Sequence, residues 1–218
     1  LNSMHFSSLT PEFQVLIVYN PAAGQSPNLV ATLDRVANLW RDLGWRVDIA
    51  ATTAPGDATT RAQQAAADGY NAVIAAGGDG TVNEVMNGLI GTNTALGTLP
   101  LGTVNIWARE MGLSMDMLKA ATSLAQSDLT KIDVGMAGDR YFLLMAGIGF
   151  DAAVTETVCA QAKKRLGAIA YLKQAIQVAW NFRGVRLNLR IDGKRVRGRI
   201  LMVVIGNSQL YGGVFKLT

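Results

Sequence analysis

The chain has 218 residues, half of them hydrophobic, which is enough for one large domain or two small ones with a sizeable core. Its net charge of +4 comes from 20 basic and 16 acidic residues, and no basic tract alternates with aromatic residues, so we expect no nucleic-acid partner. The single cysteine, Cys159, excludes an intramolecular disulfide, and the single histidine excludes a histidine-based metal cluster.

Strand and helix patterns alternate through the first half of the chain. Short apolar runs at 15–19 and 72–76 predict buried strands, and the segments 46–50 and 96–100 are predicted as further strands. Apolar residues at helical spacing predict helices between and after them, over 29–43, 57–68, 81–90, 106–111 and 115–126. Asp57 and Ser114 are predicted N-caps, and Trp40 a core residue. Because the connections are long enough for parallel crossovers, residues 14–130 are predicted to form a doubly wound α/β domain.

The stretch 72–90 joins a buried strand, the loop Gly77-Gly78-Asp79-Gly80 and a helix beginning at Thr81. Glycines let an anion approach backbone N–H groups closely, and the first N–H groups of a helix lack internal partners, so this order predicts a phosphate site. Asp79 would repel a polyphosphate unless Mg²⁺ or a hydrogen-bonded hydroxyl lay between them, which indicates phosphate chemistry. A plain turn between strand and helix is the alternative.

Two further strands also run into turn-forming or glycine-containing strings. Asn20-Pro21-Ala22-Ala23-Gly24 follows the strand 15–19, and Leu101-Gly102-Thr103-Val104-Asn105 follows the strand 96–100. In open α/β sheets, ligands bind at the carboxyl ends of the strands. Asn20 is therefore a candidate for a hydrogen bond to a nucleotide, and a simple turn residue is the alternative.

The pattern changes after residue 128. Strand pairs are predicted at 131–136 with 140–145, joined by Ala137-Gly138-Asp139, and at 185–191 with 195–205, joined by Asp192-Gly193. Helical stretches are predicted at 152–162 and 165–182. Residues 131–218 therefore form a predicted second, β-rich and antiparallel domain. The stretch 163–183 is basic and amphipathic, which fits either an anionic membrane surface or packing on its own sheet.

Three strings together resemble the catalytic domain of the diacylglycerol kinase family, which comprises bacterial lipid kinases and their sphingosine and ceramide kinase relatives. They are NPAAG at 20–24, GGDGTVNEVMNGL at 77–89 and PLGTVNIWARE at 100–110. The segments KIDVG at 131–135, FLLMAGIGFDA at 142–152 and YGGVFKL at 211–217 are similar to the same family. The resemblance implies an α/β nucleotide-binding domain of the NAD kinase and phosphofructokinase type, followed by a β-sandwich.

The resemblance also implies roles for individual residues. Asp79 and Asp133 would belong to the catalytic, Mg²⁺-linked polar network around the transferred phosphate, while the metal ligands themselves stay unassigned. The ATP-binding residues would lie in four loops: Asn20, Pro21, Ala22, Ala23 and Gly24; Thr52; Gly77, Gly78, Asp79, Gly80, Thr81, Val82, Asn83 and Glu84; and Gly102 and Thr103.

The sequence departs from the family pattern at three places. Gln25 stands where relatives often carry a basic residue, which removes one candidate phosphate contact. Ile106 replaces an acidic residue, and the bulky Trp107 is expected to reshape the lipid entrance. Relatives also continue past a string like YGGVFKL into a D-G-E type segment that holds the presumed base, so the resemblance implies a truncated chain that binds nucleotide and turns over poorly.

The resulting hypothesis is an ATP- and Mg²⁺-dependent lipid kinase that phosphorylates a hydroxyl of diacylglycerol or a related lipid. The alternatives are an NAD-kinase-like phosphotransferase acting on a soluble substrate, and a non-catalytic nucleotide-binding module. No run of 18 apolar residues and no basic-then-apolar leader is present, so we expect a cytoplasmic protein, peripheral at the membrane surface, that touches the membrane transiently. A second copy of the chain, forming a homodimer, is the other partner that we expect.

Overall fold

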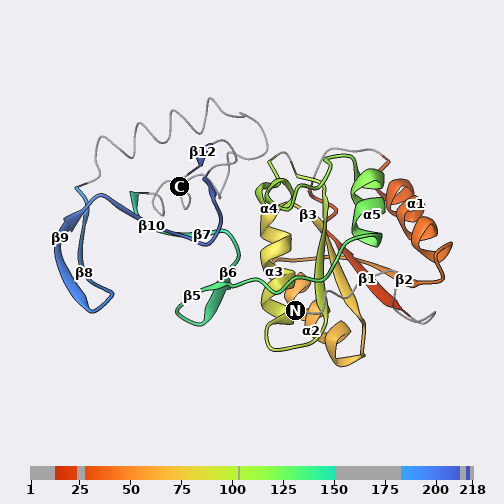
Figure 1. The fold of residues 1–218 in the computed structure, drawn as a ribbon, viewed down its shortest axis with the longest axis horizontal. Coiled ribbons are helices and arrows are strands. Elements are labelled where there is room, and N and C mark those ends of the chain that lie inside the picture. Colours follow the sequence, from red (N-terminus) through yellow and green to blue (C-terminus); the bar gives the residue numbers. More distant parts are fainter. Residues whose placement is uncertain (1–12, 24–27, 103, 151–182, 212–214, 217–218) are drawn as a thin grey trace. The chain divides into compact units, whose positions relative to one another are not determined.

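The computed structural model describes residues 13–23, 28–102, 104–150, 183–211 and 215–216 (Figure 1). The chain divides into two compact units, one made of residues up to 144 together with those from 207 onward, and the other of residues 145–206.

The first unit is built on a four-stranded parallel sheet. Its strands are β1 (Gln14–Tyr19), β2 (Arg46–Ala51), β3 (Ala72–Gly77) and β4 (Ala95–Pro100), in the order β2-β1-β3-β4. All six residues of β3 are buried, which is why this segment reads as a continuous apolar run instead of an alternating one. The four predicted strands are thereby confirmed.

Helices cover both faces of the sheet, which confirms the doubly wound α/β prediction (Figure 1). They are α1 (Leu29–Arg41), α2 (Asp57–Ala67), α3 (Asp79–Leu89), the short α4 (Ile106–Glu110) and α5 (Met117–Ala125). One core joins α1 and α5 to side chains such as Ile17 and Ile74, and the other joins α2, α3 and α4 to Val18 and Val73. Successive strand residues point to opposite faces, so one sheet supplies both cores.

Trp40 is the largest side chain that is completely buried, as predicted. Its indole Nε1 donates to Ala121 O at 3.0 Å, so the one polar atom of this side chain is satisfied inside the core. The ring lies 5.7 Å from the ring of Trp45, which in turn lies 4.7 Å from that of Phe13. Trp40 thus links α1 to α5 on one face of the sheet.

The predicted starts of α3 and α5 and the predicted N-cap of α2 are wrong, each for a local reason. Helix α3 begins at Asp79 because Gly78 already adopts the extended N-cap conformation, whereas the glycines suggested a loop as far as Gly80. In helix α2 the N-cap is Gly56, so Asp57 is the first helical residue and not the N-cap that the sequence suggested. Asp116, and not Ser114, caps α5, accepting from Lys119 N at 2.9 Å.

The remainder of the first unit is a hairpin and a returning segment. Strands β5 (Gly135–Ala137) and β6 (Arg140–Phe142) form the predicted hairpin, though with shorter strands than expected. Residues from 207 onward return to this unit, where β11 (Leu210–Tyr211) pairs with β12 (Phe215–Lys216). Asn207 ties this segment down, because its side chain donates to the carbonyl oxygens of Asp133 and Leu143, each at 2.9 Å.

The second unit contains two antiparallel pairs. Strand β7 (Met145–Gly149) pairs with β10 (Met202–Gly206), and β8 (Val185–Ile191) pairs with β9 (Lys194–Ile200). Asp192 and Gly193 both take positive φ at the β8–β9 turn, which confirms the predicted hairpin. The predicted strand 195–205 is divided at Leu201 between β9 and β10. The predicted helices at 152–162 and 165–182 lie outside the described residues.

Gly88 offers a direct test of the contact between α2 and α3. A Cβ at this position would lie 2.4 Å from Thr59 O and 2.7 Å from Ala62 Cβ. We expect Gly88→Ala to lower the free energy of unfolding by about 1–3 kcal/mol through overpacking, despite the better helix propensity of alanine. Gly80 lies in the same helix with nothing within 4 Å, so Gly80→Ala should instead raise stability slightly. Urea denaturation of both variants measures this, and equal shifts would contradict the packing described.

Candidate nucleotide site

The carboxyl ends of all four parallel strands meet at one edge of the sheet. Backbone hydrogen bonds tie the residues that follow them together: Asn20 N donates to Ala76 O at 3.0 Å, and Thr52 N to Tyr19 O at 2.8 Å. Leu101 N donates to Gly77 O at 3.1 Å. In the strand order β2-β1-β3-β4, strand β1 lies between β2 and β3. The switch point at which open α/β sheets bind ligands therefore lies at this edge, beside β1.

The structure therefore brings together most of the predicted nucleotide residues. Residues 20–23, Thr52, the glycine loop and Gly102 lie at this edge, whereas Gly24 and Thr103 lie outside the described residues. Asn20 Oδ1 accepts from Ala22 N at 2.9 Å, which makes a tight turn of the NPAA string.

The glycine loop presents backbone N–H groups at the start of α3. Thr81 N and Val82 N donate to Gly78 O at 3.0 and 3.2 Å, and Gly78 provides no side-chain cap. The N–H groups of the first two helical residues, Asp79 and Gly80, have no carbonyl four residues earlier within the helix. Such groups, together with the helix dipole, attract an anion.

Two of the loop glycines are required by close approach. A Cβ on Gly77 would lie 2.5 Å from Thr81 Oγ1, so a larger residue would displace the side chain of Thr81. A Cβ on Gly102 would lie 2.9 Å from Asn105 Oδ1 and 3.1 Å from Gly78 Cα. The loops that follow β3 and β4 therefore touch, backbone against backbone.

Asp79 joins these two loops through its carboxylate. Oδ2 accepts from Ile106 N at 3.1 Å and Oδ1 from Trp107 N at 3.0 Å, so Asp79 caps α4 from a distant part of the chain. Asn105, the residue at the N-cap position of α4, makes no capping bond. It has a φ of 46°, is buried, and uses its side chain to accept from Gly102 N and to donate to Gly102 O.

Asn83 and Glu84, both predicted to contact the nucleotide, have partners within the chain. Asn83 Oδ1 accepts from Leu143 N at 3.0 Å, and its amide donates to Tyr141 O at 3.3 Å. Glu84 Oε2 accepts from Gly56 N at 3.0 Å. These contacts make both residues positioning groups that attach β6 and the start of α2 to α3.

The sequence reasoning missed two other positioning residues. Asn87 lies one helical turn after Asn83 and exchanges hydrogen bonds with Tyr141, accepting from its N–H and donating to its carbonyl, both at 2.9 Å. Glu110 accepts from the Ser208 hydroxyl and, at 3.0 Å, from Gln209 N. The asparagine pair at i and i+4 was a visible signal of a shared helix face, but neither partner could be read from the sequence.

The role of Asp133 stays a prediction, whereas Trp107 differs from what its motif suggested. Asp133 is exposed, and among the described residues no hydrogen bond or ion pair joins its carboxylate to the glycine loop. Trp107 is buried in the core shared by α3 and α4, so the expectation that it reshapes a lipid entrance is wrong. Its bulk fills the space between helix and sheet.

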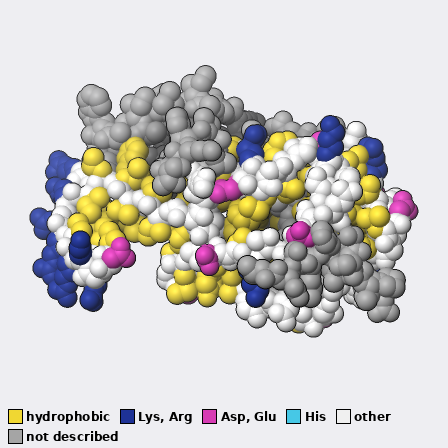
Figure 2. Space-filling view, in the orientation of Figure 1, with side chains coloured by type: hydrophobic (Ala, Val, Ile, Leu, Met, Phe, Trp, Pro, Cys, Tyr) yellow, Lys and Arg dark blue, Asp and Glu magenta, His cyan; other side chains and the backbone are white. Residues whose placement is uncertain are grey.

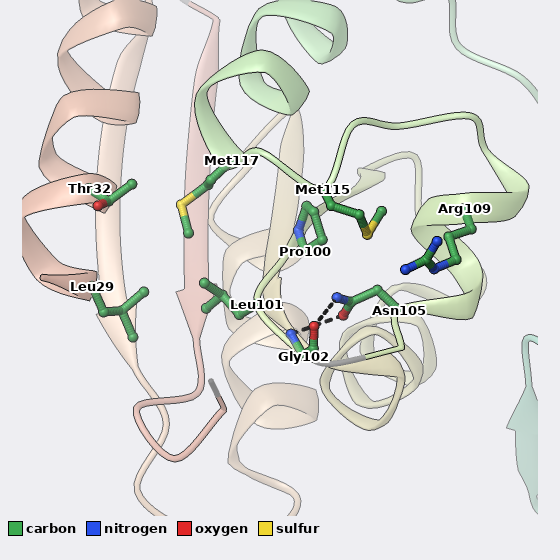
Figure 3. Close-up of a pocket in the computed structure, with 9 residues that line it drawn as sticks. All are labelled: Leu29, Thr32, Pro100, Leu101, Gly102, Asn105, Arg109, Met115 and Met117. Carbon is green, nitrogen blue, oxygen red and sulfur yellow. Dashed lines mark hydrogen bonds between the residues drawn. The ribbon is translucent and has the colours of Figure 1, made fainter. Parts of the chain in front are cut away.

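Two hollows adjoin the loops. One, of about 410 Å³, adjoins the loop after β4, and Figure 3 shows Arg109 and Asn105 facing the apolar side chains of Leu29, Met115 and Met117 across it. The other, of about 450 Å³, is lined by Pro55, Gly56, Thr59, Glu84, Asn87 and Arg140.

Within the described part of the chain, no three His, Cys, Asp or Glu side chains cluster as a metal site, and no helix is long and apolar enough to cross a membrane.

Comparison with known proteins fits this geometry. The diacylglycerol kinase catalytic domain matches residues 14–137, and the YegS C-terminal NAD kinase beta sandwich-like domain matches residues 145–218. The chain therefore belongs to the diacylglycerol kinase catalytic-domain family, and its second unit to a β-sandwich class, as predicted.

Individual relatives agree. A diacylglycerol kinase of Bacillus subtilis is 35% identical over 92% of this chain and 67% of its own length, and one of Staphylococcus aureus is 32% identical over 92% and 64%. A solved structure of a putative diacylglycerol kinase from Bacillus anthracis superposes with a TM-score of 0.77 at 30% identity, over 95% of this chain and 71% of that one. The chain thus spans about two thirds of the length of the relatives it matches.

Removal of the Asp79 carboxylate should destabilise the fold. Asp79→Ala leaves two N–H groups of α4 without their acceptor, so we expect the free energy of unfolding to fall by about 1–3 kcal/mol. Asp116→Ala, which removes the single bond that caps α5, is the matched control and should cost about 1 kcal/mol. Chemical denaturation measures both; an Asp79→Ala variant as stable as wild type would contradict the capping role.

Asp57 predicts a pH dependence of stability. Its pKa is lowered, first by the hydrogen bond from Thr53 N at 2.8 Å and also by Arg61, whose Nε lies 3.2 Å away. A carboxyl group with a depressed pKa stabilises the fold above its ordinary pKa, near 3.8, and loses that contribution as the pH falls through the folded value. The stability difference between wild type and Asp57→Asn should therefore be constant near neutral pH and shrink below about pH 4. A stability difference between the two proteins that did not change with pH would contradict this role of the Asp57 carboxylate.

Proposed function

We propose that the protein is a lipid kinase that transfers the γ-phosphate of ATP to a hydroxyl of diacylglycerol or a related lipid. The observation that carries the proposal is the contact between the glycine loop and the PLGTVN loop, joined by Asp79 at the sheet edge. Membership in the diacylglycerol kinase family supports it. The identities of the lipid substrate, the nucleotide and the metal ion all belong to this proposal.

In this proposal, backbone groups hold the phosphates. The N–H groups that begin α3 face the γ-phosphate, and the glycines leave room for it because a Cβ on Gly80 would meet nothing within 4 Å. Asn20 and Thr52, at the ends of β1 and β2, would contact the rest of the nucleotide. Phosphoryl transfer depends mostly on positioning and electrostatic stabilisation, and these are what rigid backbone donors provide.

Asp79 suits a Mg²⁺ ion held together with phosphates. A carboxylate offers about four acceptor positions, and α4 uses two of those of Asp79, which leaves others for a metal-bound water. Mg²⁺ in such sites commonly takes only one or two carboxylates besides phosphate and water, and when bound it would neutralise charge on the phosphate oxygens. We keep Asp133 as the second predicted member of this network.

Assays on the full-length gene product test the reaction. With Mg²⁺-ATP, we expect phosphate transfer to at least one of diacylglycerol, ceramide or a sphingoid base. Transfer to NAD or another soluble acceptor alone would refute a lipid kinase. Binding of ATP by calorimetry without transfer to any acceptor would indicate a non-catalytic nucleotide-binding protein.

Gly80→Ala separates nucleotide binding from stability. The added methyl group lies where a phosphate would approach the helix, so we expect ATP affinity to fall at least tenfold while the fold is no less stable. Gly198→Ala, another glycine with nothing within 4 Å, is the control and should bind ATP normally. Calorimetric titration measures both, and unchanged affinity of Gly80→Ala would place the phosphates elsewhere.

A further inference from the structure

The β8–β9 hairpin has two chemically different faces. Side chains alternate along a strand, so cross-strand partners two positions apart share a face. The register places three consecutive pairs on one face: Arg186 with Arg199, Asn188 with Arg197, and Arg190 with Arg195. This set of five arginines and one asparagine is called the arginine face below.

The opposite face of the hairpin is apolar except next to the turn, where Ile191 pairs with Lys194. It pairs Val185 with Ile200 and Leu189 with Val196, and the side chains of Val185, Leu187 and Leu189 are half-buried. A Cβ on Gly149 of β7 would lie 3.4 Å from Val185 Cγ2, which shows that the base of this face packs within its own unit. All five arginines are exposed, and Figure 2 shows basic side chains gathered over the hairpin.

Among the described residues, no carboxylate forms an ion pair with the arginine face, and the acidic residue of the hairpin itself, Asp192, lies in its turn. Like charges directly opposite each other on a sheet are destabilising, yet two of the three pairs are arginine with arginine. The ion pairs of the described residues, Arg46–Asp48 and Arg61–Asp57, involve no hairpin arginine. One weak bond, Arg197 Nε to Asn188 Oδ1 at 3.4 Å, lies within the face. The arrangement therefore fits a partner that supplies many anions in one plane.

We propose that the arginine face docks on an anionic lipid bilayer. Guanidinium groups bind phosphates with two parallel hydrogen bonds, and five exposed guanidinium groups on one face of the hairpin can contact several headgroup phosphates of a bilayer. Residues 183–206 contain no aromatic side chain for stacking against bases, which disfavours single-stranded nucleic acid. The choice of a lipid over another polyanion rests on the proposed lipid substrate, whereas the arginine face itself does not.

Vesicle sedimentation without ATP tests the proposal. The 218-residue chain should bind vesicles that contain phosphatidylglycerol and not pure phosphatidylcholine vesicles, with an affinity that falls as salt is added. Because each basic residue near an anionic surface contributes about a fivefold change in affinity, the triple variant Arg190→Gln/Arg195→Gln/Arg197→Gln should bind on the order of 100-fold more weakly.

Two control variants separate this surface from net charge and from misfolding. Arg35→Gln/Lys119→Gln/Lys131→Gln removes the same charge from exposed positions of the first unit and should bind nearly as wild type. Arg190→Lys/Arg195→Lys/Arg197→Lys keeps the charge and should retain most of the binding. Thermal unfolding of the glutamine variant should occur at or above the wild-type temperature, because the like-charge pair of Arg190 and Arg195 has been removed.

Three results would overturn the proposal. They are unchanged vesicle binding by the hairpin glutamine variant, an equal loss in the first-unit control, and binding of wild type to duplex DNA as tight as to anionic vesicles at the same salt concentration. Because phosphate transfer is not measured, failure of the kinase assay would refute the proposed function and leave this result standing.

Discussion

The arrangement of the candidate site depends on the carboxylate of Asp79. Helix α4 has only five residues, too few to persist without tertiary contacts, and its N-cap position is occupied by a residue with positive φ that makes no capping bond. Asp79 supplies the missing acceptors from the first turn of α3, so one side chain fixes both the start of α4 and the loop that precedes it. The glycine loop and the loop after β4 are therefore held rigidly against each other.

The strands, and the order of strand, glycine loop and helix at 72–90, were predictable because their signals are local. The two central strands, β1 and β3, are mainly apolar because helices cover both faces of the sheet, and helices follow the strands at amphipathic spacing. The N-cap of α2 and the starts of α3 and α5 were not predicted correctly. A glycine serves as N-cap for two of them, and glycine indicates a loop as readily as a cap.

The roles of Asn83, Glu84 and Asn87 were not predictable, because they depend on partners far away in the sequence. Tyr141 and Leu143 lie 54 to 60 residues from the asparagines that bind them, and Gly56 lies 28 residues from Glu84. The resemblance assigned Asn83 and Glu84 to the nucleotide, which stays a prediction, and the structure adds that their side chains hold neighbouring elements in place. A motif identifies which residues a site needs, and it does not separate those that touch a ligand from those that position the loop.

The distinction between contact and positioning explains why the site consists so largely of glycine and backbone. Asn83, Glu84 and Asn105 use their side chains on the chain itself, which leaves backbone N–H groups and part of one carboxylate directed at the sheet edge. Backbone donors fixed at a helix start need no reorganisation when charge builds up on a phosphate, because the fold has already oriented them. In the proposed reaction, the side chains named by the motif would keep those donors fixed, and the carboxylate of Asp79 would be the group that also meets a metal-bound water.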